Sequence, residues 1–274
     1  MRTDLLPVRA RPAIVLVLVF AVGVVAFGWP FLVQHGAALD TSHSGDSPLV
    51  FVVLLPLLAM IVLAELTTGR LSGKGRGMDA KAVALLGMLA AVGGALRALG
   101  PGTAGLEPSF AVIVLGGRVF GRGFGFVLGA LTLFVGALLT GGVGPWLPFQ
   151  MIAAGWVGFF AGCLPPARGR GEVAVLAAYA FVVSLLFGAV MNLWFWPFAS
   201  YGPEVSYVAG GTLTGNLHRY WVFYVTTSLP WDLGRAVLSC LLVGLAGSAL
   251  LRALRRAARR AAFDAVPVFE QEQV

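Results

Sequence analysis

The polar residues of this chain that could do chemistry stand beside long apolar runs and form no catalytic pattern. Three histidines, His35, His43 and His218, are far apart and lack the spacing of a metal site. The apolar runs hold no paired acids, Gly-x-Ser-x-Gly run or His-Glu pair. Cys163 and Cys240 give neither a disulfide framework nor metal spacing. The pattern predicts no enzyme, no metal and no cofactor, which leaves binding as the chemistry to consider.

Two amides are the first candidates for binding. Asn192 recurs at four-residue spacing with Ser184, Gly188 and Trp196, so these residues share one helix face and Asn192 is expected to point into the bundle. Gln150 begins a similar face. Contact with a bound molecule and a hydrogen bond to a neighbouring helix both account for such amides in an apolar segment.

Two arginines, Arg97 and Arg235, lie at the ends of apolar runs where other basic residues are absent. Asp232 precedes Arg235 by three residues, the spacing of a helical ion pair. Arg97 has Glu107 in the following loop as its one candidate partner. Either Arg97 extends to lipid headgroups, or it captures a phosphate or carboxylate on a bound molecule.

The elements that must position these residues are membrane helices. The 274 residues are 58% hydrophobic and only 11% charged, whereas soluble domains carry about 25% charged residues. Apolar runs long enough to cross ~30 Å of hydrocarbon recur along the chain. We expect an all-α membrane protein with eight spans: Ala13–Val33, Leu49–Leu66, Ala80–Leu99, Phe110–Val119, Phe124–Thr140, Leu147–Leu164, Val173–Pro197 and Trp231–Arg252.

The distribution of charge predicts the orientation of these spans. Of the 19 Lys and Arg residues, all but Arg97, Arg219 and Arg235 fall in the tails and in alternate connections. The positive-inside rule therefore places both termini in the cytoplasm of a multi-pass protein of the cell membrane. The net charge of +7 is explained by topology and lipid headgroups and does not indicate nucleic acid.

The chain divides into four parts. Residues 1–66 hold two helices, of which we favour the first as a retained span over a cleaved signal peptide. Residues 67–79 form a basic, Gly-rich cytoplasmic linker that lacks the spacing and the Ser or Thr of a phosphate-binding loop, so ATP hydrolysis is not expected. Residues 80–252 form a six-helix core, and residues 253–274 a cytoplasmic tail.

Small residues recur along one face of the helix that opens the core. They are Ala80, Ala84, Gly87 and Ala91, and a second stripe runs through Ala90, Gly94 and Ala98. Helices in lipid associate through close backbone contact at such positions. Packing inside the bundle and docking of a partner membrane subunit both remain open for the first stripe.

The next stretch carries a resemblance to a known family. A short helix followed by GRVFGRGFGFVLGAL, and the later run PWLPFQMIAAGWVGFFAG, resemble helices of the substrate-binding S components of energy-coupling factor (ECF) vitamin transporters, actinobacterial type. The resemblance covers residues 79–252. It implies a six-helix core that binds a vitamin at its outer face, with a membrane coupling subunit and two ATPases as partners. The Ala80, Ala84, Gly87 and Ala91 stripe would contact the coupling subunit. The two additional helices depart from the family pattern.

Amides, arginines and aromatic rings gather at the predicted outer ends and loops. Aromatic rings with a few polar groups suit a vitamin pocket, although an aromatic belt at the membrane interface is the alternative. Cobalamin or a related corrinoid is the leading cargo, with riboflavin and thiamine open. An intramembrane lipid-modifying enzyme and a membrane assembly factor are the alternative functions. The predicted substrate-binding residues are Arg97, Glu107, Trp146, Phe149, Gln150, Asn192, Trp196, Tyr220, Trp221 and Tyr224.

Overall fold

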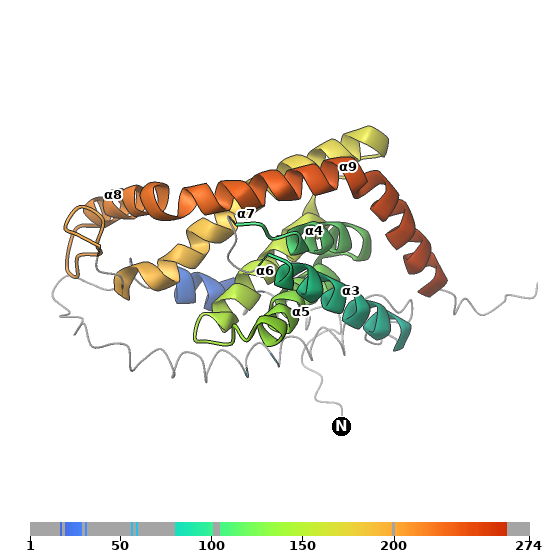
Figure 1. Cartoon of the computed structure of the whole chain (residues 1–274), viewed down its shortest axis with the longest axis horizontal. Coiled ribbons are helices and arrows are strands. Elements are labelled where there is room, and N and C mark those ends of the chain that lie inside the picture. Colours follow the sequence, from blue (N-terminus) through green and yellow to red (C-terminus); the bar gives the residue numbers. More distant parts are fainter. Residues whose placement is uncertain are drawn as a thin grey trace, which may run out of the picture.

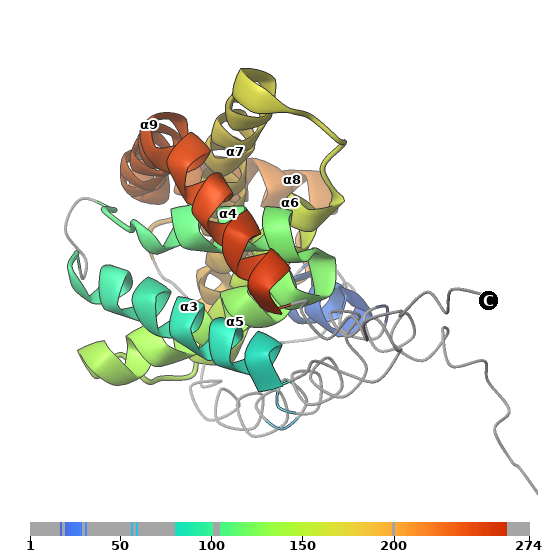
Figure 2. The same cartoon turned by 90° about the vertical axis from the view of Figure 1, so that its right-hand side faces the viewer.

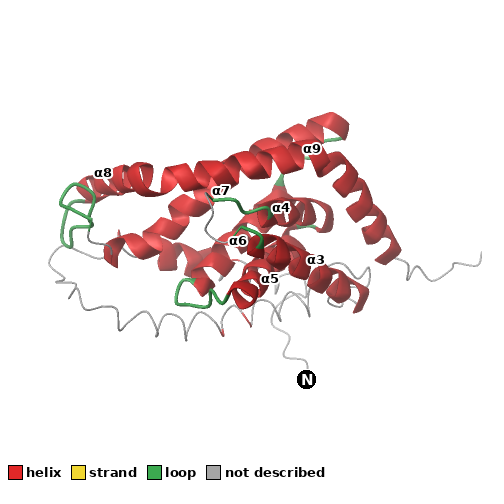
Figure 3. Cartoon of the chain, in the orientation of Figure 1, coloured by secondary structure: helices red, strands yellow, loops and turns green. Residues whose placement is uncertain are grey.

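The computed structural model describes residues 80–100, 105–198 and 201–261, together with residues 17, 20–28, 31, 56 and 59. These residues contain helices and turns and no strand (Figure 3). The helices are α3 (Ala80–Ala98), α4 (Ser109–Phe120), α5 (Arg122–Thr140), α6 (Leu147–Cys163), α7 (Gly169–Phe195), α8 (Leu213–Phe223) and α9 (Leu229–Ala261). A 3-10 turn, Trp196–Phe198, follows α7, and a π-helical segment, Tyr224–Ser228, joins α8 to α9.

Within this part of the chain, four helices are long and apolar enough to cross a membrane. They span Lys81–Ala98, Arg122–Thr140, Gly169–Phe195 and Leu213–Arg259. Two further apolar helices, α4 and α6, are shorter. The short helix predicted at Phe110–Val119 is confirmed as the 12-residue α4, but it is not among the helices long enough to span a membrane. At 1.5 Å per residue, α4 is about 18 Å long, so it cannot cross ~30 Å of hydrocarbon.

The helices pack in three layers. In the end-on view of Figure 2, α3 and α5 lie on one side, α7 and the first part of α9 lie on the other, and α4 and α6 lie between them. The short α4 is therefore surrounded by protein, and nine of its twelve residues are buried. The last turns of α9 bend back towards α3 (Figure 1), where Leu254 and Ala258 pack against a cluster that includes Leu86 and Phe124.

Glycines make the contacts of α4, α5 and α6 close. A Cβ atom added at Gly117 or at Gly125 would lie within 2.5 Å of the Gly158 carbonyl oxygen, and one added at Gly129 would meet the Ala154 carbonyl. Gly121, at φ +93°, forms the one-residue turn between α4 and α5. The glycine-rich sequences thus let three backbones touch, as expected for helices that associate in lipid.

The count of eight spans is not confirmed, because most residues of the first two predicted spans lie outside the described part of the chain. The connection predicted between Phe198 and Pro230 was wrong in part, because α8, the π-helical segment and α9 form one continuous helical run, Leu213–Ala261. The run begins where the Thr212 hydroxyl accepts a hydrogen bond from the Gly215 amide, and it ends nine residues beyond the predicted Arg252. Polar residues and Pro230 concealed this helix in the sequence.

Only a small part of the two N-terminal helices predicted in residues 1–66 lies among the described residues. Residues 20–28 are helical and pack against α6: Phe20 lies 4.9 Å from Phe159 and Phe27 lies 5.5 Å from Phe149, measured between ring centroids. The second predicted span has only residues 56 and 59 within the described part of the chain, and the 67–79 linker lies outside it.

Candidate functional site

The polar network at one end of the bundle begins with Arg97, in the last turn of α3. Its Nη1 lies 3.0 Å from Oε1 of Glu107, and its Nη2 donates to Oε1 of Gln150 over 3.1 Å. A Cβ at Gly136 would meet the aliphatic part of Arg97, so this glycine lets the arginine cross α5. Three predicted residues, from α3, the following loop and α6, are therefore brought together. We call this polar network the Arg97 network and this end of the bundle the Arg97 end.

Arg235 extends the network from α9. Its Nη1 lies 3.6 Å from Oε2 of Glu107, and its Nη2 contacts Asp232 and donates to the Ser184 carbonyl over 3.0 Å. The guanidinium lies over the rings of Phe110 and Phe187, at 5.3 and 4.9 Å from their centroids. The ion pair predicted between Asp232 and Arg235 is confirmed. The second ion pair of Arg235, with Glu107, was not predicted.

Asp232 depends on a small neighbour. A Cβ at Gly188 would overlap the Asp232 carboxylate, so α7 admits this acid only because residue 188 is glycine. The Tyr224 hydroxyl donates to the Leu185 carbonyl over 3.3 Å, and Oδ2 of Asp232 is buried without a hydrogen-bond partner among the described residues. Charge in this buried cluster is balanced, because two carboxylates face two guanidiniums.

Asn192 sits beside this network on α7. Its Nδ2 donates to the Ser228 hydroxyl over 2.7 Å. The predicted face of Ser184, Gly188 and Asn192 therefore meets α9 and the π-helical segment. Two side-chain atoms, Oδ1 of Asn192 and Nε2 of Gln150, have no hydrogen-bond partner within the described part of the chain. Both residues are half-buried. Each amide thus has one polar atom without a partner among the described residues.

The π-helical segment sets the position of Ser228. Pro230 has no N–H group, and its ring would clash with the carbonyl four residues earlier in an α-helix. The wider π turn, Tyr224–Ser228, precedes it. The Thr226 and Thr227 hydroxyls donate to the carbonyls of Val222 and Phe223, over 2.8 and 2.7 Å. Both hydroxyls thus bond to the carbonyl four residues earlier in the same helical run.

A second group of predicted residues forms an aromatic cluster. The fully buried Trp196 lies 5.2 Å from Tyr220, 5.3 Å from Tyr207 and 6.2 Å from Phe31, between ring centroids. Its Nε1 donates to the Val205 carbonyl over 2.6 Å. The Tyr220 hydroxyl donates to the Ala189 carbonyl. Burial raises the pKa of Tyr207 above its ordinary value, which keeps this hydroxyl neutral.

Three predicted residues lie away from both groups. Phe149 is buried in the core against Phe27 and Trp194. Trp146 donates to the Gly142 carbonyl of its own turn over 3.1 Å. Trp221 is 62% exposed and reaches only the ring of Tyr224, at 6.1 Å.

The opposite end of the bundle holds a separate polar network. The buried Oε1 of Glu172, in the first turn of α7, accepts from Nε of Arg118 over 2.8 Å and from Nη2 of Arg255 over 2.6 Å. Nη1 of Arg118 also donates to the Leu164 carbonyl over 2.9 Å. We call this the Glu172 end. The sequence did not single out Glu172, because its partners lie 54 and 83 residues away.

The two stripes of small residues on α3 differ in their environment. Ala90 and Gly94 are buried, and a Cβ at Gly94 would meet Val135 of α5. In contrast, Ala84, Gly87 and Ala91 are exposed, and no atom lies within 4 Å of a Cβ added at Gly87. The second stripe therefore packs inside the bundle, while the first faces outward. The side chain of Ala80, where α3 begins, is not described.

Comparison with known proteins now identifies the family. The family described as ECF transporter, substrate-specific component, matches residues 81–246, more than half of the chain. The chain belongs to this family of S components. No curated protein and no solved structure matches it. ECF S components are membrane transport subunits, take a small-molecule substrate, and work with a membrane coupling subunit and ATPases.

The candidate site of this S component lies within the part of the chain that matches the family. The matched region, residues 81–246, contains every residue of the Arg97 network. Within the described residues, no group of three or more His, Cys, Asp or Glu side chains is arranged to hold a metal. The Arg97 network offers ion pairs and two amides, which suits recognition of a polar small molecule.

Proposed function

We propose that this S component captures a vitamin at the Arg97 end, facing the outside of the cell, and passes it inward with the coupling subunit and two ATPases. The observation that carries the proposal is the convergence of Arg97, Glu107 and Gln150 from separate elements, beside the Arg235 pair. A balanced, buried ion network holds its members in fixed geometry. The free polar atoms of Gln150 and Asn192 can then bind cargo without rearrangement.

The orientation is supported by charge. Among the described residues, five arginines at the Glu172 end have a single acidic partner among them, Glu172, whereas Arg97 and Arg235 are matched by Glu107 and Asp232. The five are Arg118, Arg168, Arg170, Arg252 and Arg255. The positive-inside rule places the first group in the cytoplasm. Both termini would then be cytoplasmic.

Cobalamin or a related corrinoid is the proposed cargo. Such a molecule combines a broad macrocycle with amide groups. The exposed rings of Tyr201 and Trp221 supply area for the macrocycle, and the Arg97 network supplies donors and acceptors for the amide groups.

Calorimetric titration of the purified full-length chain in detergent tests the proposal. The titrants are cobalamin, riboflavin, thiamine and biotin. Submicromolar binding of cobalamin supports both function and cargo. Tight binding of another vitamin keeps the function and refutes the corrinoid. Absence of submicromolar binding to the whole panel contradicts vitamin capture.

The position of the site is tested separately. Asn192→Ala and Gln150→Ala should each weaken binding by about tenfold, because each removes polar contacts worth about 1–2 kcal/mol. Thr140→Ala is the matched control, since Thr140 is exposed at the same end and its hydroxyl bonds to the Gly136 carbonyl of its own helix. Unchanged affinity in both amide variants would place the pocket elsewhere.

The coupling subunit is proposed to dock on the exposed stripe of α3. Ala84, Gly87 and Ala91 leave the backbone open to close approach by another membrane helix. This surface is distinct from the second stripe, which α5 already covers.

A further inference from the structure

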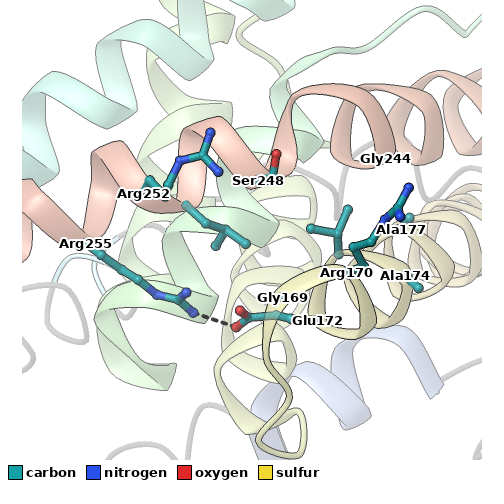
Figure 4. Close-up of a pocket in the computed structure, with 11 residues that line it drawn as sticks. Gly169, Arg170, Glu172, Ala174, Ala177, Gly244, Ser248, Arg252 and Arg255 are labelled. Carbon is teal, nitrogen blue, oxygen red and sulfur yellow. Dashed lines mark hydrogen bonds and ion pairs between the residues drawn. The ribbon is translucent and has the colours of Figure 1, made fainter.

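A cavity opens at the Glu172 end between α7 and α9. Its volume is about 800 Å³, and residues from the first turns of α7 face residues from the second half of α9. Figure 4 shows Arg255 reaching from α9 to Glu172 on α7, with Ser248 and Arg252 on the same side of the cavity as Arg255. The lining residues are Gly169, Arg170, Glu172, Val173, Ala174, Ala177, Gly244, Ser248, Leu251, Arg252 and Arg255.

The charges that line the cavity do not balance. Its lining residues include three arginines, Arg170, Arg252 and Arg255, and a single carboxylate, that of Glu172. That carboxylate already binds Arg255 and, from behind, Arg118. Arg170 and Arg252 are exposed and make no ion pair with any described residue. The cavity therefore presents two uncompensated cations to a ligand.

The rest of the cavity and its surroundings are small or apolar. Ala174, Ala177 and Gly244 leave space beside the guanidiniums, and Val173 and Leu251 line the wall. Further along α7 and α9, Val182, Leu241 and Leu245 are exposed in the segments that cross the membrane. A ligand with an anionic head and apolar chains would match both surfaces.

We propose that this cavity binds a phosphate group, carried by the headgroup of an anionic phospholipid. Guanidinium groups bind phosphate oxygens through charge-assisted hydrogen bonds, and the Ser248 hydroxyl can donate a further one. Basic pockets between membrane helices bind anionic headgroups in this way. A free phosphate ion carries the same phosphate oxygens as the lipid headgroup, but it has no apolar chains to contact the apolar walls. The inference does not depend on cargo binding, because the Arg97 network lies at the opposite end.

Binding of short-chain phosphatidylglycerol to the purified full-length chain in detergent tests the site. Short-chain phosphatidylcholine and inorganic phosphate are measured in parallel. The test variant is Arg170→Gln with Arg252→Gln, which leaves the Glu172 pairs intact. The control variant, Arg256→Gln with Arg259→Gln, removes the same charge from exposed positions of α9 that do not line the cavity.

The expected result is specific to headgroup and position. Phosphatidylglycerol should bind more tightly than phosphatidylcholine, and the test variant should lose affinity by about tenfold while the control variant keeps it. Equal binding of the two lipids, or equal losses in the two variants, would overturn the proposal. If inorganic phosphate binds as tightly and shows the same loss in the test variant, the phosphate site stands and a free anion is its ligand. Vitamin affinity should be the same in all three chains.

Discussion

Glu107 joins two arginines that are 138 residues apart in the sequence. Its two oxygens lie 3.0 Å from Arg97 and 3.6 Å from Arg235, in a part of the bundle where all three side chains are mostly buried. Removing one member of a buried ion pair leaves the partner charge uncompensated, which costs more than the pair itself contributes. Glu107 is thus the residue on which the geometry of the Arg97 end depends.

Glu107→Gln should lower the free energy of unfolding by about 3 kcal/mol, because two guanidiniums lose their shared carboxylate. Denaturation of the purified protein in detergent measures this loss. Glu204→Gln, at an exposed loop position, should change stability by less than about 0.5 kcal/mol. Equal stability of the Glu107 variant and the wild type would contradict the role of the ion network. Adding Arg97→Met to Glu107→Gln should recover part of the loss, since one unpaired charge is removed.

The sequence predicted the site only where partners are near each other in the chain or share one helix. The pairs Arg97–Glu107 and Asp232–Arg235 are separated by ten and three residues, and spacing was enough to suggest both. The bonds from Arg97 to Gln150 and from Asn192 to Ser228 join different helices, so they depend on the rotation of each helix. Gly136 and Gly188 set that rotation by admitting particular side chains, which a single sequence does not reveal.

At the scale of elements, the π-helical segment before Pro230 directs Ser228 to Asn192. Pro230→Ala restores an N–H group and removes the clash, so the segment is free to become a regular α-helix. We expect the variant to be at least as stable as the wild type but to bind vitamin about tenfold more weakly, because Ser228 and Tyr224 rotate away from α7. Calorimetry and thermal unfolding measure the two quantities. Pro203→Ala, in the exposed loop before α8, is the control. Unaltered affinity would mean that the π turn is not needed by the site.

The exposed stripe of α3, Ala84, Gly87 and Ala91, can be tested as the docking surface for the coupling subunit. Gly87→Leu adds bulk where no neighbour lies within 4 Å, so the isolated chain should fold and bind vitamin as before. The added side chain should hold a partner helix away and reduce vitamin uptake by cells by about tenfold or more. Ala178→Leu, at an exposed position of α7, is the matched control. Wild-type uptake by the Gly87 variant would exclude this face as the docking surface.

At the scale of the whole molecule, apolar runs and glycine spacing predicted most of the bundle. Each core helix from α3 to α7 was located within a few residues, because membrane helices need long apolar sequences. The continuous run from Leu213 to Ala261 was missed at its start, residues 213–230, where polar residues and Pro230 resemble a loop. Contacts outside the local sequence determine the structure of this segment. The Asn216 side chain accepts from the N–H of Val208 and donates to its carbonyl, and the π turn allows the helix to continue through Pro230.

The proposed orientation of the whole molecule can be tested with cysteine labelling, because the described ends of the bundle already differ in this residue. Cys163 is exposed at the Glu172 end, and Cys240 lies within a membrane-spanning segment. In a Cys240→Ala chain, a membrane-impermeant maleimide should label Cys163 only after the cells are permeabilised, since the positive-inside rule places that end in the cytoplasm. In a chain with Cys163→Ala, Cys240→Ala and Glu204→Cys, the same reagent should label intact cells. The reverse pattern would put the Arg97 end inside, and capture of a vitamin from outside by that network would then be ruled out.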